Sequence, residues 1–456
     1  MSFPAYPTHK DSGSEWIGEI PDHWSASPLK RAFKIEGGST PPPDEANWDG
    51  DIAWVTPADL SGLSSLFLDA SKRTITARGL ASCGTTLLPA GSLILSTRAP
   101  IGSLAIGLIS MCTNQGCKGL VPNANASAAY FAFVLLTAKG ELNNRGRGST
   151  FLEISGDELS RFSVPTPPFV EQTQIARFLD HETARIDALI EEQQRLIELL
   201  KEKRQAVISH AVTKGLDPNV PMKDSGVEWI GEVPAHWDVK ALRYLGECQN
   251  GINIGGEAFG SGSPFVSYGD VHKNHVLPAE VAGLVQSSPE DQQRYSVRNG
   301  DVLFTRTSET VDEIGFSSTC LQSIENATFA GFLIRFRPIG ESLSPHFSKY
   351  YFRNQGLRIF FNKEMNLVTR ASLSQDLLKL LPVTVPPLSE QEKISGFLDR
   401  ITETFASLLE QGLRSIELLT ERRSALISAA VTGKIDVRGW QSPACVTTIE
   451  LTLEAV

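Results

Sequence analysis

Two stretches far apart in this chain are nearly identical. Residues 10–24 read KDSGSEWIGEIPDHW and residues 223–237 read KDSGVEWIGEVPAHW, so twelve of fifteen positions agree at an offset of 223 − 10 = 213. A second pair follows, because PPFVEQTQIARFLD begins at Pro167 and PPLSEQEKISGFLD begins at Pro386. This period is too long for a solenoid of short repeats. The duplication therefore predicts two tandem copies of one domain plan.

Between these matched segments the two copies differ strongly. The variable blocks are rich in Gly, Ser, Thr and Pro, and they contain the short β-type runs DIAWV (51–55), SLILST (92–97), DVLFT (301–305) and FLIRF (332–336). Turn residues separate the runs, which predicts an α/β (α+β) globule with a largely antiparallel sheet in each copy. AGSLILSTRAPIGS (90–103) weakly resembles NGDVLFTRTSETVDEIGF (299–316), including a Thr-Arg pair just after the strand, which indicates that the two blocks share one fold.

Each copy ends in a long amphipathic segment. Steps of four and three residues from Ile175 and from Ile394 reach ten positions in each copy, of which seven are apolar, the pattern of a coiled-coil seam. Each helix would have about 40 residues and a length of roughly 60 Å. A single helix cannot bury the row of apolar residues along its own face, but two helices of equal length can bury each other's rows. We therefore expect two long antiparallel coiled-coil helices and an internal pseudo-two-fold. Positions expected on these helices, and taken as subunit contacts, are Ile186, Leu196, Phe405 and Leu419.

These patterns divide the chain into five parts. The expected parts are a first domain at 1–165, a helical spacer at 166–217, a second domain at 218–385, a second spacer at 386–440 and a tail at 441–456.

Composition narrows the class of protein. The net charge is −10 and the pI is near 5.4, which counts against a freestanding nucleic-acid binder, because such proteins usually carry a basic face. The six cysteines include no C-x-x-C pair and do not recur between the copies, so neither a disulfide framework nor a structural zinc is expected. No signal peptide or membrane span is visible, so we expect a cytoplasmic protein without a membrane partner.

The sequence contains no convincing catalytic constellation. TPPF (166–169) resembles the Asn/Asp-Pro-Pro-aromatic loop of amino-group DNA methyltransferases, but neither it nor VPPL (385–388) has the required Asn or Asp. The histidines of HKNH (272–275) have no recurring acidic or Cys ligands nearby. His23 and His236 recur beside tryptophans and are interpreted as packing and hydrogen-bonding residues. No catalytic residue, metal site or cofactor is predicted in this chain.

The doubled motifs as a set resemble one known family. The E-W-I-G-x-x-P-x-H-W openings, TNQGCKGL (113–120) and the two PP-x-x-EQ helix starts are similar to those of the specificity subunit of Type I restriction-modification enzymes, over about residues 10–440. The resemblance implies two target recognition domains that each read one half of a bipartite, asymmetric site in double-stranded DNA. It also implies that the helices dock two methyltransferase subunits, with restriction (helicase-nuclease) subunits as further partners. S-adenosylmethionine, ATP and Mg would then act in those partner chains.

Several polar loops carry the side chains that bind base edges and phosphates. Among them we expect DNA contacts from long cationic donors, namely Arg98, Lys118, Arg145, Arg147, Arg306 and Arg370. An alternative function is a two-domain scaffold for protein ligands built on the helical spacer, which the acidic balance favours. A third, an enzyme acting alone, has no visible site.

Overall fold

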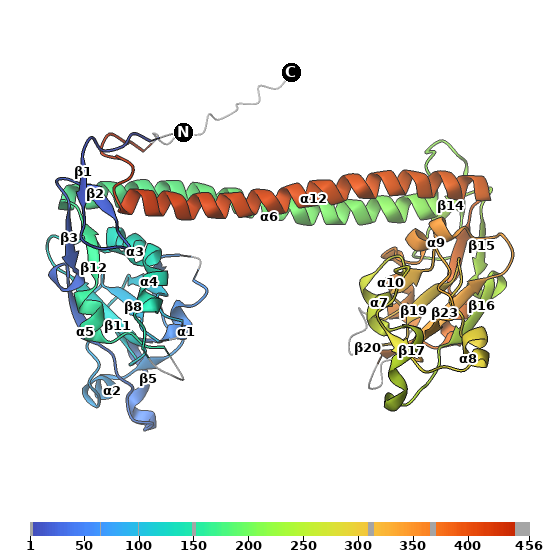
Figure 1. The fold of residues 1–456 in the computed structure, drawn as a ribbon, viewed down its shortest axis with the longest axis horizontal. Coiled ribbons are helices and arrows are strands. Elements are labelled where there is room, and N and C mark those ends of the chain that lie inside the picture. Colours follow the sequence, from blue (N-terminus) through green and yellow to red (C-terminus); the bar gives the residue numbers. More distant parts are fainter. Residues whose placement is uncertain are drawn as a thin grey trace, which may run out of the picture. The chain divides into compact units, whose positions relative to one another are not determined.

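The computed structural model describes residues 3–63, 65–98, 100–147, 152–308, 314–364 and 371–442. It divides into two compact units, the first comprising residues 1–193 and 414–456 and the second residues 194–413. Each unit therefore combines one variable block with a part of both long helices, α6 (Phe169–Lys214) and α12 (Leu388–Val431) (Figure 1).

The first unit has a largely antiparallel sheet with the strand order β4-β11-β8-β9-β6. Only β6 pairs in parallel within this sheet. The strands of this unit are β1 (His9–Asp11), β2 (Glu19–Pro21), β3 (Ser25–Pro28), β4 (Phe33–Gly37), β5 (Trp48–Val55), β6 (Phe67–Leu68), β7 (Thr74–Ile75), β8 (Leu93–Ser96), β9 (Leu104–Gly107), β10 (Met111–Thr113), β11 (Cys117–Pro122) and β12 (Ser163–Thr166). Its short helices are α1 (Pro57–Leu60), α2 (Ala77–Ala81), α3 (Ala128–Thr137), α4 (Lys139–Asn144) and α5 (Gly156–Arg161).

The second unit repeats this plan with the order β16-β23-β19-β21. Its strands are β13 (Met222–Asp224), β14 (Glu232–Pro234), β15 (Asp238–Ala241), β16 (Gly246–Asn250), β17 (Phe259–Val266), β18 (Leu284–Val285), β19 (Val302–Thr305), β20 (Thr307–Ser308), β21 (Ser317–Thr319), β22 (Thr328–Phe329), β23 (Leu333–Pro338), β24 (Ala371–Ser372) and β25 (Pro382–Val385). Its short helices are α7 (Tyr268–Lys273), α8 (Pro289–Arg294), α9 (Pro345–Tyr351), α10 (Gly356–Glu364) and α11 (Gln375–Leu380). The four predicted β-type runs all form strands, and the expectation of one α/β fold in two copies is confirmed.

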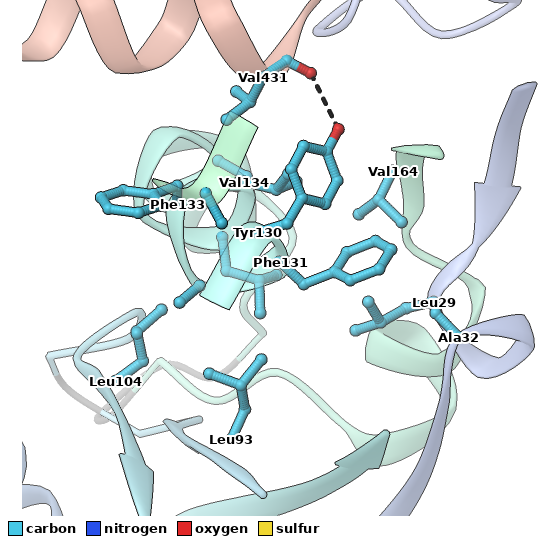
Figure 2. Close-up of a cluster of buried hydrophobic side chains, with 14 of the residues drawn as sticks. Leu29, Ala32, Leu93, Leu104, Tyr130, Phe131, Phe133, Val134, Val164 and Val431 are labelled. Carbon is cyan, nitrogen blue, oxygen red and sulfur yellow. Dashed lines mark hydrogen bonds between the residues drawn. The ribbon is translucent and has the colours of Figure 1, made fainter. Parts of the chain in front are cut away.

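In each unit one apolar core joins the sheet to the helices. In the first unit α3 lies between the sheet and the long helices, and its residues share a buried cluster with Leu93 of β8, Ile175 of α6 and Val431 of α12. Tyr130, fully buried on α3, donates from its hydroxyl to the carbonyl oxygen of Val431 at 3.2 Å (Figure 2). Burying an aromatic side chain together with its satisfied hydroxyl fixes both position and orientation, so α3 holds the block against the helices.

The two long helices run antiparallel within each unit. In the first unit Asp187 of α6 forms an ion pair with Arg423 of α12, with a nitrogen–oxygen distance of 2.8 Å, and Phe178 contacts the later Trp440. In the second unit a Cβ built on Gly412 of α12 would lie 3.0 Å from Cγ1 of Ile197, so the helices approach closely there. The antiparallel arrangement is therefore confirmed.

The expected seam register was wrong in the middle of the helices. Leu196 is 45% exposed and Leu408 is 42% exposed, whereas Ile197 is 6% exposed. The predicted stripe kept a strict heptad step from Ile175, but a straight helix of 3.6 residues per turn drifts away from that step. The buried positions therefore move by one residue, from Leu196 to Ile197.

Candidate nucleic-acid interface

A duplicated glutamate anchors each block to the start of its long helix. In the second unit Glu390, in the first turn of α12, lies 2.6 Å from Nε2 of His236 and accepts a hydrogen bond from Nε1 of Trp237 at 2.8 Å. The motif P-x-HW and the motif PP-x-x-EQ therefore recur together because their side chains bind each other. The interpretation of His23 and His236 as packing and hydrogen-bonding residues is confirmed.

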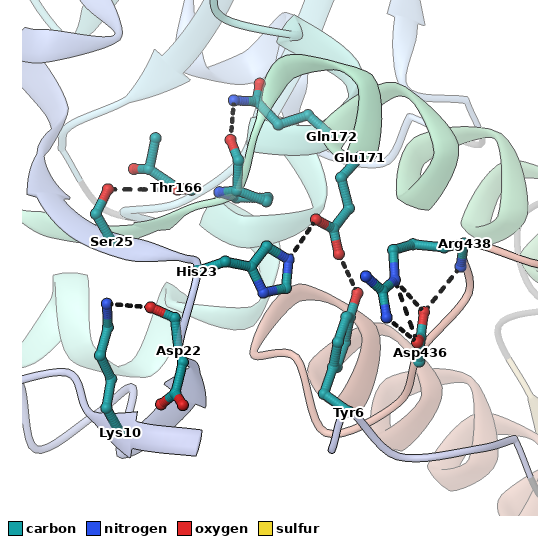
Figure 3. A network of polar contacts seen from close by, with 11 residues as sticks. Tyr6, Lys10, Asp22, His23, Ser25, Thr166, Glu171, Gln172, Asp436 and Arg438 are labelled. Carbon is teal, nitrogen blue, oxygen red and sulfur yellow. Dashed lines mark hydrogen bonds and ion pairs between the residues drawn. The ribbon is translucent and has the colours of Figure 1, made fainter. Parts of the chain in front are cut away.

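The first unit uses the same anchor with one more partner. Glu171 lies 2.9 Å from Nε2 of His23 and accepts a hydrogen bond from the hydroxyl of Tyr6 (Figure 3). Burial, followed by the hydrogen bond to Glu171, raises the pKa of Tyr6 well above its usual range. The hydroxyl of Tyr6 thus donates to the glutamate in the first unit, as the indole N–H of Trp237 does in the second unit. Nε1 of Trp24 has no hydrogen-bond partner among the described residues.

The glutamine that follows each glutamate caps a helix of the block. Oε1 of Gln172 accepts from the backbone N–H of Ser127, the N-cap of α3, at 2.9 Å. Gln391 accepts in the same way from Ser344, the N-cap of α9, at 2.8 Å. Because the first N–H groups of a helix have no partner inside the helix, this contact stabilises the helix start and fixes the block relative to the adjoining long-helix segment.

With the block held in this way, three polar segments of the first unit meet at the end of β8. The backbone N–H of Thr97 donates to the carbonyl oxygen of Gly116 at 2.9 Å, and the N–H of Ile154 donates to the carbonyl oxygen of Thr97 at 3.0 Å. Next to this point Arg98 and Glu153 form an isolated β-bridge. We name residues 96–98, 113–118 and 152–156 the first strand-end junction.

The second unit builds the same junction from different residues. The N–H of Arg306, directly after β19, donates to the carbonyl oxygen of Phe332 at 2.9 Å, and the N–H of Leu373 donates to the carbonyl oxygen of Arg306 at 2.8 Å. Thr307 then pairs with Ser372 across β20 and β24. Residues 305–308, 332–334 and 371–373 form the second strand-end junction. Arg306 therefore occupies the place of Thr97, so the two Thr-Arg pairs are displaced by one residue relative to each other in the fold.

Three of the predicted DNA-contact residues gather at the first junction. Arg98 is an exposed residue whose Nε lies 2.9 Å from Oε2 of Glu153. Arg147 is exposed and exchanges two backbone hydrogen bonds with the same Glu153. Lys118 lies half-buried on β11, next to the strand end, with Gly37 as its cross-strand partner. Of these three residues, Arg98 reaches the carboxylate of Glu153 with its side chain, and Arg147 pairs with the backbone of Glu153.

Arg145 is held by contacts within the unit. Its guanidinium lies 3.0 Å from Glu141 and 3.6 Å from Glu158, and it covers the ring of Phe162 at 4.9 Å from the centroid. These contacts direct the side chain to the protein, whereas those of Arg98 leave it 44% exposed.

In the second unit the predicted residues are Arg306 and Arg370. Arg306 is half-buried, and its Nε has no hydrogen-bond partner in the described part of the chain. Arg370 lies outside the described residues.

Arg335, on β23 of the same unit, was not singled out from the sequence. It stands where Gly119 stands in the first sheet, because the two pair with Leu303 and Ile94 at equivalent positions of β19 and β8. Arg335 is 6% exposed and donates to the carbonyl oxygen of Ser296 at 2.6 Å. Its pKa is lowered to about 10, chiefly by burial. It therefore stabilises the block from inside.

A stacked cation of the first block was also missed. The guanidinium of Arg73 lies 3.7 Å from the ring centroid of Trp48 and 5.5 Å from that of Trp54. The two tryptophans lie on β5, six residues apart. Their ring centroids lie 5.0 Å apart, because the pairing of β5 is irregular between Trp48 and Ile52 and brings the two rings together. The alternation of a regular strand could not have predicted this contact.

The described thiols have the character of core residues. Burial raises the pKa of Cys112 and of Cys117 to about 12, so both are protonated at neutral pH and are poor nucleophiles. Among the described residues no three His, Cys, Asp or Glu side chains are grouped as metal ligands. In the same residues no helix combines the length and the apolar character that a membrane crossing requires.

The fold and its junctions define a protein of two tandem α/β units that share a pair of long helices. The model of the type I restriction modification DNA specificity domain matches residues 21–200 and 234–418. The chain belongs to this family, and the resemblance found in the sequence is confirmed.

Individual relatives agree with this assignment. The chain is 30% identical to the MjaIX specificity subunit of a type I restriction enzyme from Methanocaldococcus jannaschii, over 52% of this chain and 55% of that protein. It is 24% identical to the EcoKI specificity subunit of Escherichia coli K12, over 67% of this chain and 64% of that protein. The chain thus spans less than two thirds of the length of these two relatives.

Solved structures share the fold. A chain from work on complex assembly and conformational transition of the type I R-M system aligns with a TM-score of 0.71 at 16% identity, over 91% of this chain and 99% of that chain. The HsdS subunit of Thermoanaerobacter tengcongensis aligns with a TM-score of 0.57 at 16% identity, over 91% of this chain and 98% of that chain.

Proposed function

We propose that this chain is the non-catalytic DNA sequence-specificity subunit of a type I restriction-modification complex, working in the cytoplasm. Each unit reads one half of a bipartite, asymmetric site in double-stranded DNA. Methyl transfer with S-adenosylmethionine, and cleavage with ATP and Mg, belong to the methyltransferase and restriction subunits.

The observation that carries this proposal is the pair of strand-end junctions. Both use the same backbone hydrogen bonds, but they present Thr97 and Arg98 in one unit and Arg306 and Thr307 in the other. A shared frame with different polar side chains suits two readers with different half-sites, because specificity resides in the side chains that meet base edges. Arg98, Lys118, Arg147 and Arg306 are the proposed contacts of the described chain, and Arg370 is retained as a fifth. Arg145 becomes a supporting residue.

The helices are proposed to dock the methyltransferase subunits through apolar side chains that the helix pair leaves exposed. In the second unit Leu199 of α6 is 52% exposed and Leu413 of α12 is 56% exposed, beside the exposed Leu196. Of the four residues expected as subunit contacts, Ile186 and Phe405 are buried and Leu419 is half-buried. Leu196 is therefore the member of that set that we assign to docking.

Selection from randomised DNA tests the function directly. The chain, purified with its proposed methyltransferase partner, is expected to enrich duplexes that carry two short specified blocks separated by an unspecified gap. A single contiguous motif would contradict two independent readers. Enrichment of no motif would favour the protein-binding scaffold instead.

A further inference from the structure

The two units differ in how they cover one equivalent phenylalanine. In the first unit Phe178 of α6 is fully buried. The ring of Trp440 packs against it with a centroid distance of 5.4 Å, and the ring of Phe3 does so at 4.9 Å. Nε2 of Gln174, one turn earlier on α6, donates to the carbonyl oxygen of Val437 at 3.1 Å. A peptide segment with an aromatic side chain therefore closes this face.

The equivalent residue of the second unit is open. The duplicated helix segments align at an offset of 386 − 167 = 219, which makes Phe397 the counterpart of Phe178. Phe397 is only half-buried. It lines a groove of about 570 Å³ together with Val207 and Ala211 of α6 and with Leu216 and Pro218 of the following segment.

Phe178 and Phe397 differ in burial because different numbers of chain segments pack against them. In the first unit both ends of the chain meet there, since the N–H of Asp436 donates to the carbonyl oxygen of Pro4 at 2.7 Å. In the second unit one continuous segment, residues 215–222, links α6 to β13. Residues 215–221 follow α6 as residues 434–440 follow α12, but Pro221 stands where Trp440 stands. This segment therefore brings no indole to the groove.

Substitutions around the groove specify what would fill it. Lys393 stands where Gln174 stands, and His210 stands where Ala429 stands. Lys203 and His210 line the groove itself, whereas Lys393 lines an adjoining hollow together with Leu216. The groove therefore carries an ammonium group and an imidazole as donors. A carboxylate on the occupant would be complementary to this rim.

We propose that the groove at Phe397 is a docking site for an aromatic side chain next to a carboxylate, carried by the methyltransferase subunit. The assignment of the partner rests on the proposed function. The two ends of the helix pair are then unequal docking sites, because Trp440 closes the equivalent face of the first unit from within the chain.

A defined probe tests the groove itself. 5-Fluoroindole-3-acetate combines an aromatic ring with a carboxylate, and its binding to the full chain is measured by fluorine NMR. Ala206→Trp fills the groove, and Ala425→Trp is the matched control at the equivalent exposed position of the first unit. We expect the first variant to weaken binding by about fivefold or more, the second to leave it unchanged, and 5-fluorotryptamine to bind more weakly than the carboxylate. Equal binding to the wild-type chain and to Ala206→Trp, or a preference for the amine, would overturn the proposed site.

Assembly with the methyltransferase subunit, measured by mass photometry, tests the partner. Ala206→Trp is expected to lose one bound subunit at concentrations where the wild-type chain and Ala425→Trp are saturated. If Ala206→Trp loses probe binding but assembles like the wild-type chain, the partner assignment is wrong. If the wild-type chain itself binds no methyltransferase subunit, the proposed function fails, whereas the probe still decides the chemistry of the groove.

Discussion

Thr97 and Arg306 hold the same place in the hydrogen-bond pattern of their respective units. Each donates its backbone N–H to a carbonyl oxygen directly before the neighbouring strand, that of Gly116 or of Phe332. Each also accepts from a later backbone N–H, that of Ile154 or of Leu373. The equivalent backbone carries a hydroxyl in one unit and a guanidinium in the other, and the proposal of two different half-sites rests on this difference.

Replacing the arginines at these junctions should separate base reading from general DNA affinity. Arg306→Ala is expected to weaken binding to the preferred site by about 1–3 kcal/mol and to relax one base position, if the guanidinium meets a base edge. A phosphate contact would weaken all sequences alike. Binding to a panel of single-base variants distinguishes the two. Arg145→Ala is the control, because its contacts with Glu141 and Glu158 predict loss of stability with an unchanged sequence preference.

The helix register gives a prediction about stability. Ile197→Asp should lower the free energy of unfolding by several kcal/mol, because it places a carboxylate without a partner at a 6% exposed position against Gly412. Leu196→Asp changes the neighbouring residue, which is 45% exposed, and should cost less than about 0.5 kcal/mol. Urea denaturation of both variants measures the difference. Equal destabilisation by the two would contradict the buried register.

The glutamate anchor can be tested with a neighbouring control. Glu390→Ala removes the acceptor for His236 and leaves the indole N–H of Trp237 without its partner, so we expect a loss of about 1–3 kcal/mol in unfolding free energy. Glu392→Ala, an exposed position two residues later on the same helix, should change it little. If Glu392→Ala lowered the unfolding free energy as much as Glu390→Ala, the loss would come from the start of the helix in general and not from the contacts of Glu390 with His236 and Trp237.

Acid should weaken the ion pair between Asp436 and Arg438 in the segment after α12. The hydrogen bond from Arg438 holds the pKa of Asp436 below its ordinary value of 3.8, so Asp436 contributes stability above that pH and loses it as the pH falls further. Asp436→Asn should therefore lower the unfolding free energy at pH 7, by less than about 1 kcal/mol because Arg438 is half exposed. The difference from the wild-type chain should shrink as the pH falls below 3.8, because protonation of Asp436 removes the same interaction. If the difference in unfolding free energy between the two proteins grew on acidification, Asp436 would not stabilise the fold through its charged form.

The duplicated motifs were enough to predict two copies of one fold and two antiparallel helices, because identical residues at a fixed offset report repeated packing. That Glu171 binds His23, and Glu390 binds His236, could also have been inferred from their joint recurrence. The burial of Ile197 in place of Leu196 could not have been inferred from the sequence. A helix of 3.6 residues per turn drifts away from a heptad step, and which residue is buried then depends on where the two helices touch. Nor did sequence reveal that Arg335 faces inward, because Ser296, which accepts its hydrogen bond, lies 39 residues away in a variable segment.

Exchange of one block tests the central claim most directly. Residues 218–385 are replaced by the corresponding block of another member of the family, and the methylated motif is read by methylome sequencing of a host that carries the complete system. The two-reader account predicts that one half of the motif changes while the other half stays the same. A change in both halves, or in neither with methylation intact, would contradict it.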